Sequence, residues 1–173
     1  MASPKLVELA VQKGFSKSAG QFDYAKDYSD FLVTTFARGR TRRATTTSLL
    51  EQHKGSFDVS SMMGTLRHHD DEHFDPQTAS LISVDVCMHA GFGPIHISQS
   101  TASMVVYLDG DTPIIFATGT SAPCTSIFKP MWVASRASLS TLGPVPTSQA
   151  DSDSLFWSHE RLHRATLLNY PER

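Results

Sequence analysis

Three histidines and four acidic residues fall within nine positions, in the stretch RHHDDEHFD (residues 67–75). Imidazole nitrogens and carboxylate oxygens both bind divalent metals, and His69 and His73, four positions apart, would share one helix face. His68, His69 and His73 therefore form a candidate metal site. The competing interpretation is a solvated helix end, because the acidic residues follow the point where a helix is expected to fray.

A second stretch, FATGTSAPCTSIFKP (residues 116–130), is poor in charge and rich in small hydroxyl residues. Gly119 permits another group to approach the backbone closely. Thr118, Thr120 and Ser121 carry hydroxyls that can bond to local backbone groups or line the rim of a pocket. A structural role is the favoured interpretation, since hydroxyls in such turns usually satisfy backbone groups.

The chain has two cysteines, Cys87 and Cys124. Two cysteines do not make a disulfide scaffold, and reduced thiols in the cytoplasm are the default expectation. Cys87 lies between apolar neighbours, which favours a packed thiol over a nucleophile. Arg42 and Arg43 belong to a basic cluster that is either a solvent-facing helix surface or a clamp for a carboxylate.

Composition narrows the class of protein. The 173 residues suit one domain, residues 1–173, with 40% hydrophobic and 18% charged residues. A formal net charge of -2 gives no electrostatic case for binding nucleic acid. No apolar run reaches the roughly 18–20 residues that span a bilayer, so no membrane association is expected. No motif predicts a cofactor.

Helical patterns dominate the first seventy residues. The residues expected to start, stop or break these helices are Ser3 as an N-cap, Pro4 at the first helical position, Gly14 as a stop, Gly39 as a break, Gly55 as a stop, and Asp58 as the N-cap of residues 59–69.

The pattern then changes to strands. Residues 81–89 alternate apolar and polar side chains, which is typical of a half-buried strand. Residues 103–119 predict two antiparallel strands, and residues 126–134 predict another. An amphipathic helix over residues 153–170, capped by Asp153, follows a polar linker. Helices, then antiparallel strands, then a helix favour an α+β fold.

Five segments, taken in order, resemble the secernin and dipeptidase family: FDYAKDYSD, SMMGTLRHH, SQSTASMVVYL, FATGTSAPCTSIFKP and WSHERLHR. The family's corresponding segments read LRDH, SQTTASMV, TGTSxPCxSxFKP and W.HERLHR. The resemblance extends over nearly the whole chain and is most specific over residues 98–130. His68 replaces the aspartate of LRDH, and Ser100 replaces the first threonine of SQTT.

The resemblance implies part of an αββα N-terminal-nucleophile hydrolase sandwich, an antiparallel sheet packed with helices. It also implies amide hydrolysis by a cysteine at the mature N-terminus, whose thiol attacks and whose α-amine accepts the proton. Here the N-terminal residues are Met-Ala-Ser, and removal of Met1 exposes Ala2. The chain thus resembles the C-terminal portion of a dipeptidase, and alone is expected to be inactive.

The same resemblance implies the remaining site and partner expectations. Arg42 or Arg43 would approach the nucleophile, and the 116–130 stretch would support the pocket through Thr118, Thr120 and Ser121. The expected partners are a peptide substrate, once an N-terminal segment completes the site, and a second copy of the chain. Two other functions stay open: a non-enzymatic, secernin-like interaction module linked to secretion, and a metal-binding domain.

Overall fold

The computed structural model describes residues 3–30, 34–35, 37–77, 85–90, 98–108, 111–133 and 142–170. The chain divides into two compact units, Met1–Arg40 and Thr41–Arg173. Each unit is described by itself.

The first unit begins with helix α1 (Pro4–Gln12), followed by the 3-10 turn η1 (Ala19–Gln21) and the short helix α2 (Tyr24–Asp27). As predicted, Ser3 occupies the N-cap position and proline starts α1. Gly14 has φ of 73° and ends the helix, because that left-handed conformation suits glycine.

Helix α4 (Gly39–Gln52) lies mostly in the second unit, which begins at Thr41, and α5 (Val59–Leu66) follows it before the sheet. The break expected at Gly39 is the start of α4, and Gly55 lies just beyond its end with φ of 85°. Asp58 caps α5 as predicted, because its carboxylate accepts from the Ser61 amide at 2.7 Å. The Ser61 hydroxyl in turn accepts from the Asp58 amide, which completes a capping box.

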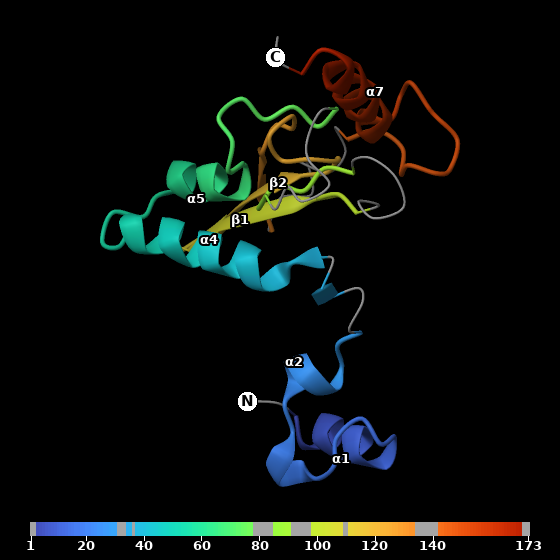
Figure 1. The fold of residues 1–173 in the computed structure, drawn as a ribbon. Helices are drawn as coiled ribbons and strands as arrows, with labels where there is room; N and C mark the ends of the chain where they lie inside the picture. Colours follow the sequence, from blue (N-terminus) through green and yellow to red (C-terminus); the bar gives the residue numbers. More distant parts are fainter. Residues whose placement is uncertain are drawn as a thin grey trace. The chain divides into compact units, whose positions relative to one another are not determined.

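A three-stranded antiparallel sheet follows, in the order β1 (Ser103–Tyr107), β2 (Ile114–Thr118) and β3 (Lys129–Trp132). All three strands were predicted from the sequence. Helix α5 packs against β1 (Figure 1). Since Val105 is the buried residue of β1 and Met104 and Val106 are exposed, one face of this strand is covered and the other is open.

The last helix, α7, runs over Leu155–Leu168. Its N-cap is Ser154 and not Asp153, which corrects the prediction by one residue. The reason is local: the Asp153 amide donates to the Asp151 carboxylate at 2.8 Å, so Asp153 belongs to the preceding turn. The Leu155 amide donates to the carbonyl of Leu142 at 3.1 Å and fixes where the helix begins.

The observed fold is α+β, as expected. The strand expected over residues 81–89 is not seen in its described part, because residues 85–89 contain a bend and have no sheet pairing. Residues 81–84 lie outside the described residues. In the part of the chain that the structure describes, no helix is both long and apolar enough to cross a membrane.

Arg67 holds the loop between β2 and β3 in place. Its Nε donates to the carbonyl of Pro123 at 2.9 Å, and its Nη2 donates to the carbonyl of Ser126 at 3.1 Å. The guanidinium also lies 4.9 Å from the centroid of the Phe128 ring. Arginine's planar fork suits this double contact, so the end of α5 fixes the loop that contains Cys124.

Candidate metal centre

Four side chains from separate parts of the second unit meet at one point: His69, Cys87, His89 and Cys124. Each offers one ligand atom, and these atoms all lie within 4.8 Å of one another. His89 Nε2 is 3.2 Å from the Cys124 sulfur and 3.6 Å from the Cys87 sulfur. Among the described residues, this is the one group of three or more histidine, cysteine or acidic side chains that could hold a metal ion.

Backbone hydrogen bonds bring together the three segments that carry these ligands. The Cys87 amide donates to the carbonyl of His68 at 3.2 Å, which places Cys87 beside the end of α5. The Ser100 amide donates to the carbonyl of Met88 at 2.9 Å, and the Ala122 amide donates to the carbonyl of Ser100 at 2.7 Å. These bonds form a chain of contacts from the end of α5 to the loop that contains Cys124.

Ala122 is strained within this loop. Its φ is 57°, in the left-handed region, where a non-glycine residue costs about 1–2 kcal/mol. The residue is fully buried, so the surrounding structure holds it there. Strain of this kind is stored where the fold needs an unusual turn, and here the turn lies two residues before Cys124.

Two neighbouring side chains, Asp85 and Phe74, orient the ring of His69. Its Nδ1 lies 3.7 Å from Oδ2 of Asp85, and both side chains are buried. The ring stacks on Phe74 at 4.0 Å between centroids, with 10° between the planes. With Nδ1 facing a carboxylate, Nε2 is the nitrogen left for a metal ion. A carboxylate, a histidine and a metal in this order are the usual outer arrangement of zinc sites.

The second oxygen of Asp85 is also fixed. Its Oδ1 accepts from the Asp70 amide at 2.8 Å, so the carboxylate cannot turn away from His69. Tyr170 closes another side of the cluster. Its hydroxyl lies 3.4 Å from His69 Nε2 and 3.4 Å from the Cys124 sulfur. The four ligand atoms are thus surrounded by groups that hold their orientation.

The pKa values of the two cysteines shift in opposite directions. A hydrogen bond from the Cys87 thiol lowers the pKa of Cys124; burial opposes this, and His69, His89 and Tyr170 add further donors. The pKa of Cys87 is raised by its bond to the Cys124 sulfur and by burial. Burial lowers the pKa of His69, but bonds to Asp85 and Cys124 outweigh it, and the net shift is upward. These shifts favour the thiolate form of Cys124, and a thiolate attracts cations.

The geometry fits a tetrahedral ion. Zinc–sulfur bonds of 2.3 Å and zinc–nitrogen bonds of 2.0–2.1 Å place neighbouring ligand atoms about 3.3–3.8 Å apart. The separations of His89 Nε2 from the two sulfurs, 3.2 and 3.6 Å, lie close to that range. Since no pair of ligand atoms exceeds 4.8 Å, the side chains need to close by no more than about 1.5 Å.

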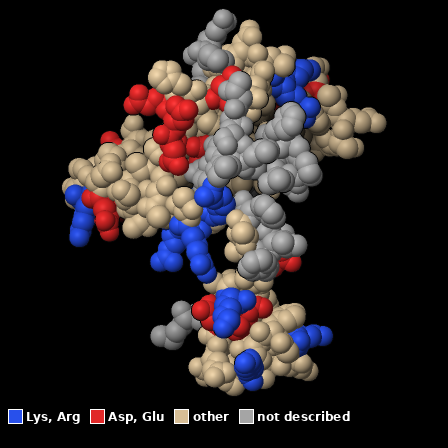
Figure 2. Space-filling model, in the orientation of Figure 1, with Lys and Arg blue, Asp and Glu red and all other residues tan. Residues whose placement is uncertain are grey.

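The three histidines singled out in the sequence separate in the structure. His69 is a member of the cluster, whereas His68 Nε2 pairs with Asp70 Oδ1 at 3.2 Å. His73 is exposed, and its amide donates to the Asp71 carboxylate at 2.8 Å. Figure 2 shows acidic side chains gathered over the loop after α5, the arrangement expected of a solvated helix end. His69 therefore has partners other than His68 and His73.

The predicted support residues of the 116–130 stretch bond to their surroundings. The Ser103 amide donates to the Thr118 hydroxyl at 2.9 Å, and Gln99 Nε2 donates to the Ser121 hydroxyl at 2.8 Å. The buried Thr120 hydroxyl pairs with that of Ser126 at 2.9 Å. Thr120 also lines a pocket between the sheet and the start of α7. Whether any of these residues serves catalysis stays a prediction.

The two arginines proposed to approach a nucleophile lie on α4. Arg43 is exposed, whereas Arg42 is half-buried. The Nε of Arg42 is buried and has no hydrogen-bond partner among the described residues.

Sequence reasoning did not find Cys87, His89 or Cys124 as candidate ligands. The signal was present in the period-2 pattern of residues 85–89. Asp85, Cys87 and His89 are all buried, while the apolar residues between them are half-buried. The alternation was real, but the polar side of the segment faces inward.

No family model matches the chain, and neither a curated protein nor a solved structure matches it.

Proposed function

We propose that this protein is a metal-binding domain that holds one zinc ion through His69, Cys87, His89 and Cys124. The observation that carries the proposal is the convergence of two sulfurs and two imidazoles within 4.8 Å, from segments far apart in sequence. Buried polar side chains of this kind are costly to assemble unless they find partners, and a metal ion supplies a partner to all four.

Zinc is favoured by ligand chemistry. Two thiolates and two imidazoles make the Cys₂His₂ set, which suits zinc's borderline softness and its tetrahedral geometry. Four protein ligands leave no open position, which is typical of a structural ion rather than a catalytic one. The ion would join the end of α5, the 85–89 segment and the β2–β3 loop, and so stabilise the second unit.

The proposed setting is the cytoplasm, as the sequence suggested. Both cysteines are free in the structure. Their sulfurs serve as ligands only while reduced, and a reducing compartment keeps them so.

Cobalt substitution tests the proposal. Cobalt(II) added to metal-free protein is expected to give the visible bands of a tetrahedral ion and the near-ultraviolet band of thiolate ligation, saturating at one equivalent. One equivalent of zinc should then abolish the signal, because zinc binds more tightly than cobalt in such sites. A spectrum of weak octahedral bands, or no sulfur band, would rule out this ligand set.

A second candidate function is the dipeptidase resemblance: the chain is the C-terminal portion of an N-terminal-nucleophile hydrolase. Four of the five family-like segments are hydrogen-bonded to one another in the second unit, which supports the proposal. The bonds that join these segments are Arg67 to the Pro123 carbonyl at 2.9 Å, Gln99 to Ser121 at 2.8 Å and Thr125 to His163 at 2.7 Å.

This candidate also proposes a second sheet or a second copy of the chain over the open sheet face. Met104 is 61% exposed and the neighbouring Leu108 is 75% exposed. Large exposed apolar patches invite association.

Mixing the chain with an N-terminal segment that begins with cysteine tests this candidate. The chain alone is expected to show no dipeptidase activity and to self-associate in light scattering. The mixture is expected to hydrolyse dipeptides, because the added residue supplies both nucleophile and base. Activity in the chain alone would contradict the expected dependence on the added cysteine. A monomer in light scattering at micromolar concentration would contradict the expected self-association.

A further inference from the structure

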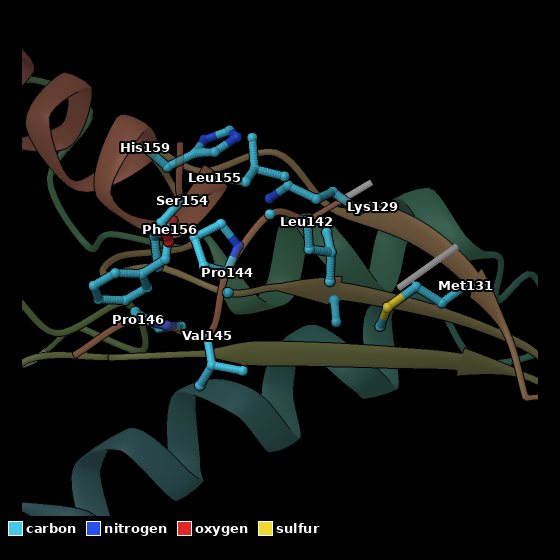
Figure 3. A pocket seen from close by; sticks show the side chains of 14 residues that line it. Lys129, Met131, Leu142, Pro144, Val145, Pro146, Ser154, Leu155, Phe156 and His159 are labelled. Carbon is cyan, nitrogen blue, oxygen red and sulfur yellow. The ribbon is translucent and has the colours of Figure 1, made fainter. Parts of the chain in front are cut away.

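A pocket of about 440 Å³ lies between the sheet and the start of α7, apart from the metal centre. Its volume falls in the range of small-molecule sites, roughly 300–1,000 Å³. Strands β2 and β3 form one wall, the loop over residues 142–146 forms another, and the first turns of α7 form a third (Figure 3). All three walls belong to the second unit.

Most of the lining is apolar. Met131 comes from β3, Leu142 and Val145 come from the loop, and Phe156 comes from α7. In Figure 3 Val145 lies across the pocket from Leu155 and His159. Val145 is 86% exposed, a large apolar side chain left open to solvent at the pocket. An occupant with a hydrocarbon body would cover this surface and gain about 25 cal/mol for each Å² removed from water.

The loop that forms this wall is fixed by a close backbone approach. Gly143 has φ of 71°, and a Cβ at this position would lie 2.0 Å from the carbonyl oxygen of Asp153. Only glycine fits there. The backbone of the loop therefore lies directly against the residue that precedes Ser154 at the start of α7.

One side of the pocket carries two basic groups. Lys129 and His159 both line it, and burial lowers the pKa of His159, with a smaller contribution from the Lys129 charge. Burial lowers the pKa of Lys129. Among the described residues, no carboxylate forms an ion pair with the Lys129 ammonium; its Nζ is 3.4 Å from the carbonyl of Ile127. The lysine charge is thus available to an anionic ligand.

A third polar group lies beside these two. Ser154 lines the pocket, is 1% exposed, and its hydroxyl has no hydrogen-bond partner among the described residues. A buried, unpaired hydroxyl costs about 1–3 kcal/mol, and a ligand oxygen would remove that penalty. Ser154 is also the N-cap of α7, a 14-residue helix whose first amides point toward this end and favour negative charge.

We propose that this pocket binds an apolar monocarboxylate, with the carboxylate at Ser154, Lys129 and His159 and the hydrocarbon body against Met131, Leu142, Val145 and Phe156. The lysine, the hydroxyl and the helix N-terminus all favour an anion, and planar carboxylate oxygens accept from several donors at once. The proposal is independent of the metal ion.

Two sources share this chemistry, a fatty acid and the C-terminus of an apolar peptide. Calorimetric titration of the full chain with decanoate, below its micelle concentration, tests the first. N-acetyl-leucyl-leucine tests the second. At least one of the two is expected to bind at one site per chain. The matched neutral probes, 1-decanol and the peptide amide, are expected to bind at least about tenfold more weakly, since they lack the charge-assisted bonds.

Variants locate the site. Lys129→Met keeps the length of the side chain and removes its charge, and should weaken the binding of the carboxylate about tenfold or more. Val145→Asp places a negative charge at an exposed position that no packing depends on, and should also weaken binding. Lys54→Met, an exposed lysine beyond α4, is the control and should leave binding unchanged.

Three results would overturn the proposal: neither carboxylate binds, the neutral probes bind as tightly as the acids, or both pocket variants bind as tightly as the unaltered chain. If decanoate alone binds, the source is an acyl chain. If only the peptide binds, the source is a peptide C-terminus.

Discussion

Replacing Cys124 by serine is expected to abolish stoichiometric zinc binding. The serine hydroxyl stays protonated at neutral pH and is a far poorer ligand than a thiolate. The zinc dissociation constant should rise by more than about 100-fold, the upper end of what the loss of an outer-shell partner costs. Competition with a fluorescent chelator measures this constant.

Stability provides the internal control for this variant. Zinc at about 100 times its dissociation constant adds about 2.7 kcal/mol to the free energy of unfolding. The unaltered chain should gain this stability in urea denaturation on adding zinc, and Cys124→Ser should not. Without zinc, the free energies of unfolding of the two proteins should differ by less than they do with zinc. Equal gains with zinc would contradict a role for Cys124 as a ligand.

The histidines of the 67–75 stretch separate two ligand sets. If His69, Cys87, His89 and Cys124 hold the ion, His68→Ala and His73→Ala should leave zinc affinity unchanged, because neither side chain reaches the cluster. Loss of zinc in these two variants, with Cys124→Ser unaffected, would favour the set inferred from sequence.

Asp85→Asn is expected to weaken zinc binding by about 10–100-fold while leaving all four ligands in place. The substitution preserves size but removes the negative charge 3.7 Å from His69 Nδ1. That charge orients the ring and raises the basicity of the ligating nitrogen. The same chelator competition measures the change in dissociation constant.

A matched substitution controls for this variant. Asp71→Asn makes the same chemical change at an exposed aspartate of the loop after α5, whose carboxylate accepts from the His73 amide. Its zinc affinity should equal that of the unaltered chain. If both variants weaken binding equally, the effect is one of general charge, and the specific role of Asp85 is wrong.

Much of the secondary structure could be predicted from the sequence because local signals decided it. Ser3, Pro4 and Gly14 bound α1, and Asp58 starts α5 through a capping box. The three strands followed from β-branched and aromatic residues between turn signals. In these elements local propensity and tertiary structure agree.

The candidate site could not be predicted because its geometry depends on long-range contacts. The 85–89 segment alternates as expected, yet its polar side is buried. Hydrophobic burial alone would turn that side outward, and only contacts with His69, from the end of α5, and Cys124, from the β2–β3 loop, reverse the preference. His89 and Cys124 are 35 positions apart, so no local sequence pattern shows that their side chains meet.

The measurement that tests the central claim most directly is the zinc-to-protein ratio of the full chain, purified from zinc-supplemented cells without chelators or affinity tags that bind metal. Elemental analysis is expected to give one zinc ion per chain, and less than about a tenth of that for Cys124→Ser, as the predicted loss of affinity requires. A chain that folds and contains no stoichiometric metal would contradict the account. So would zinc retained at one equivalent by the variant.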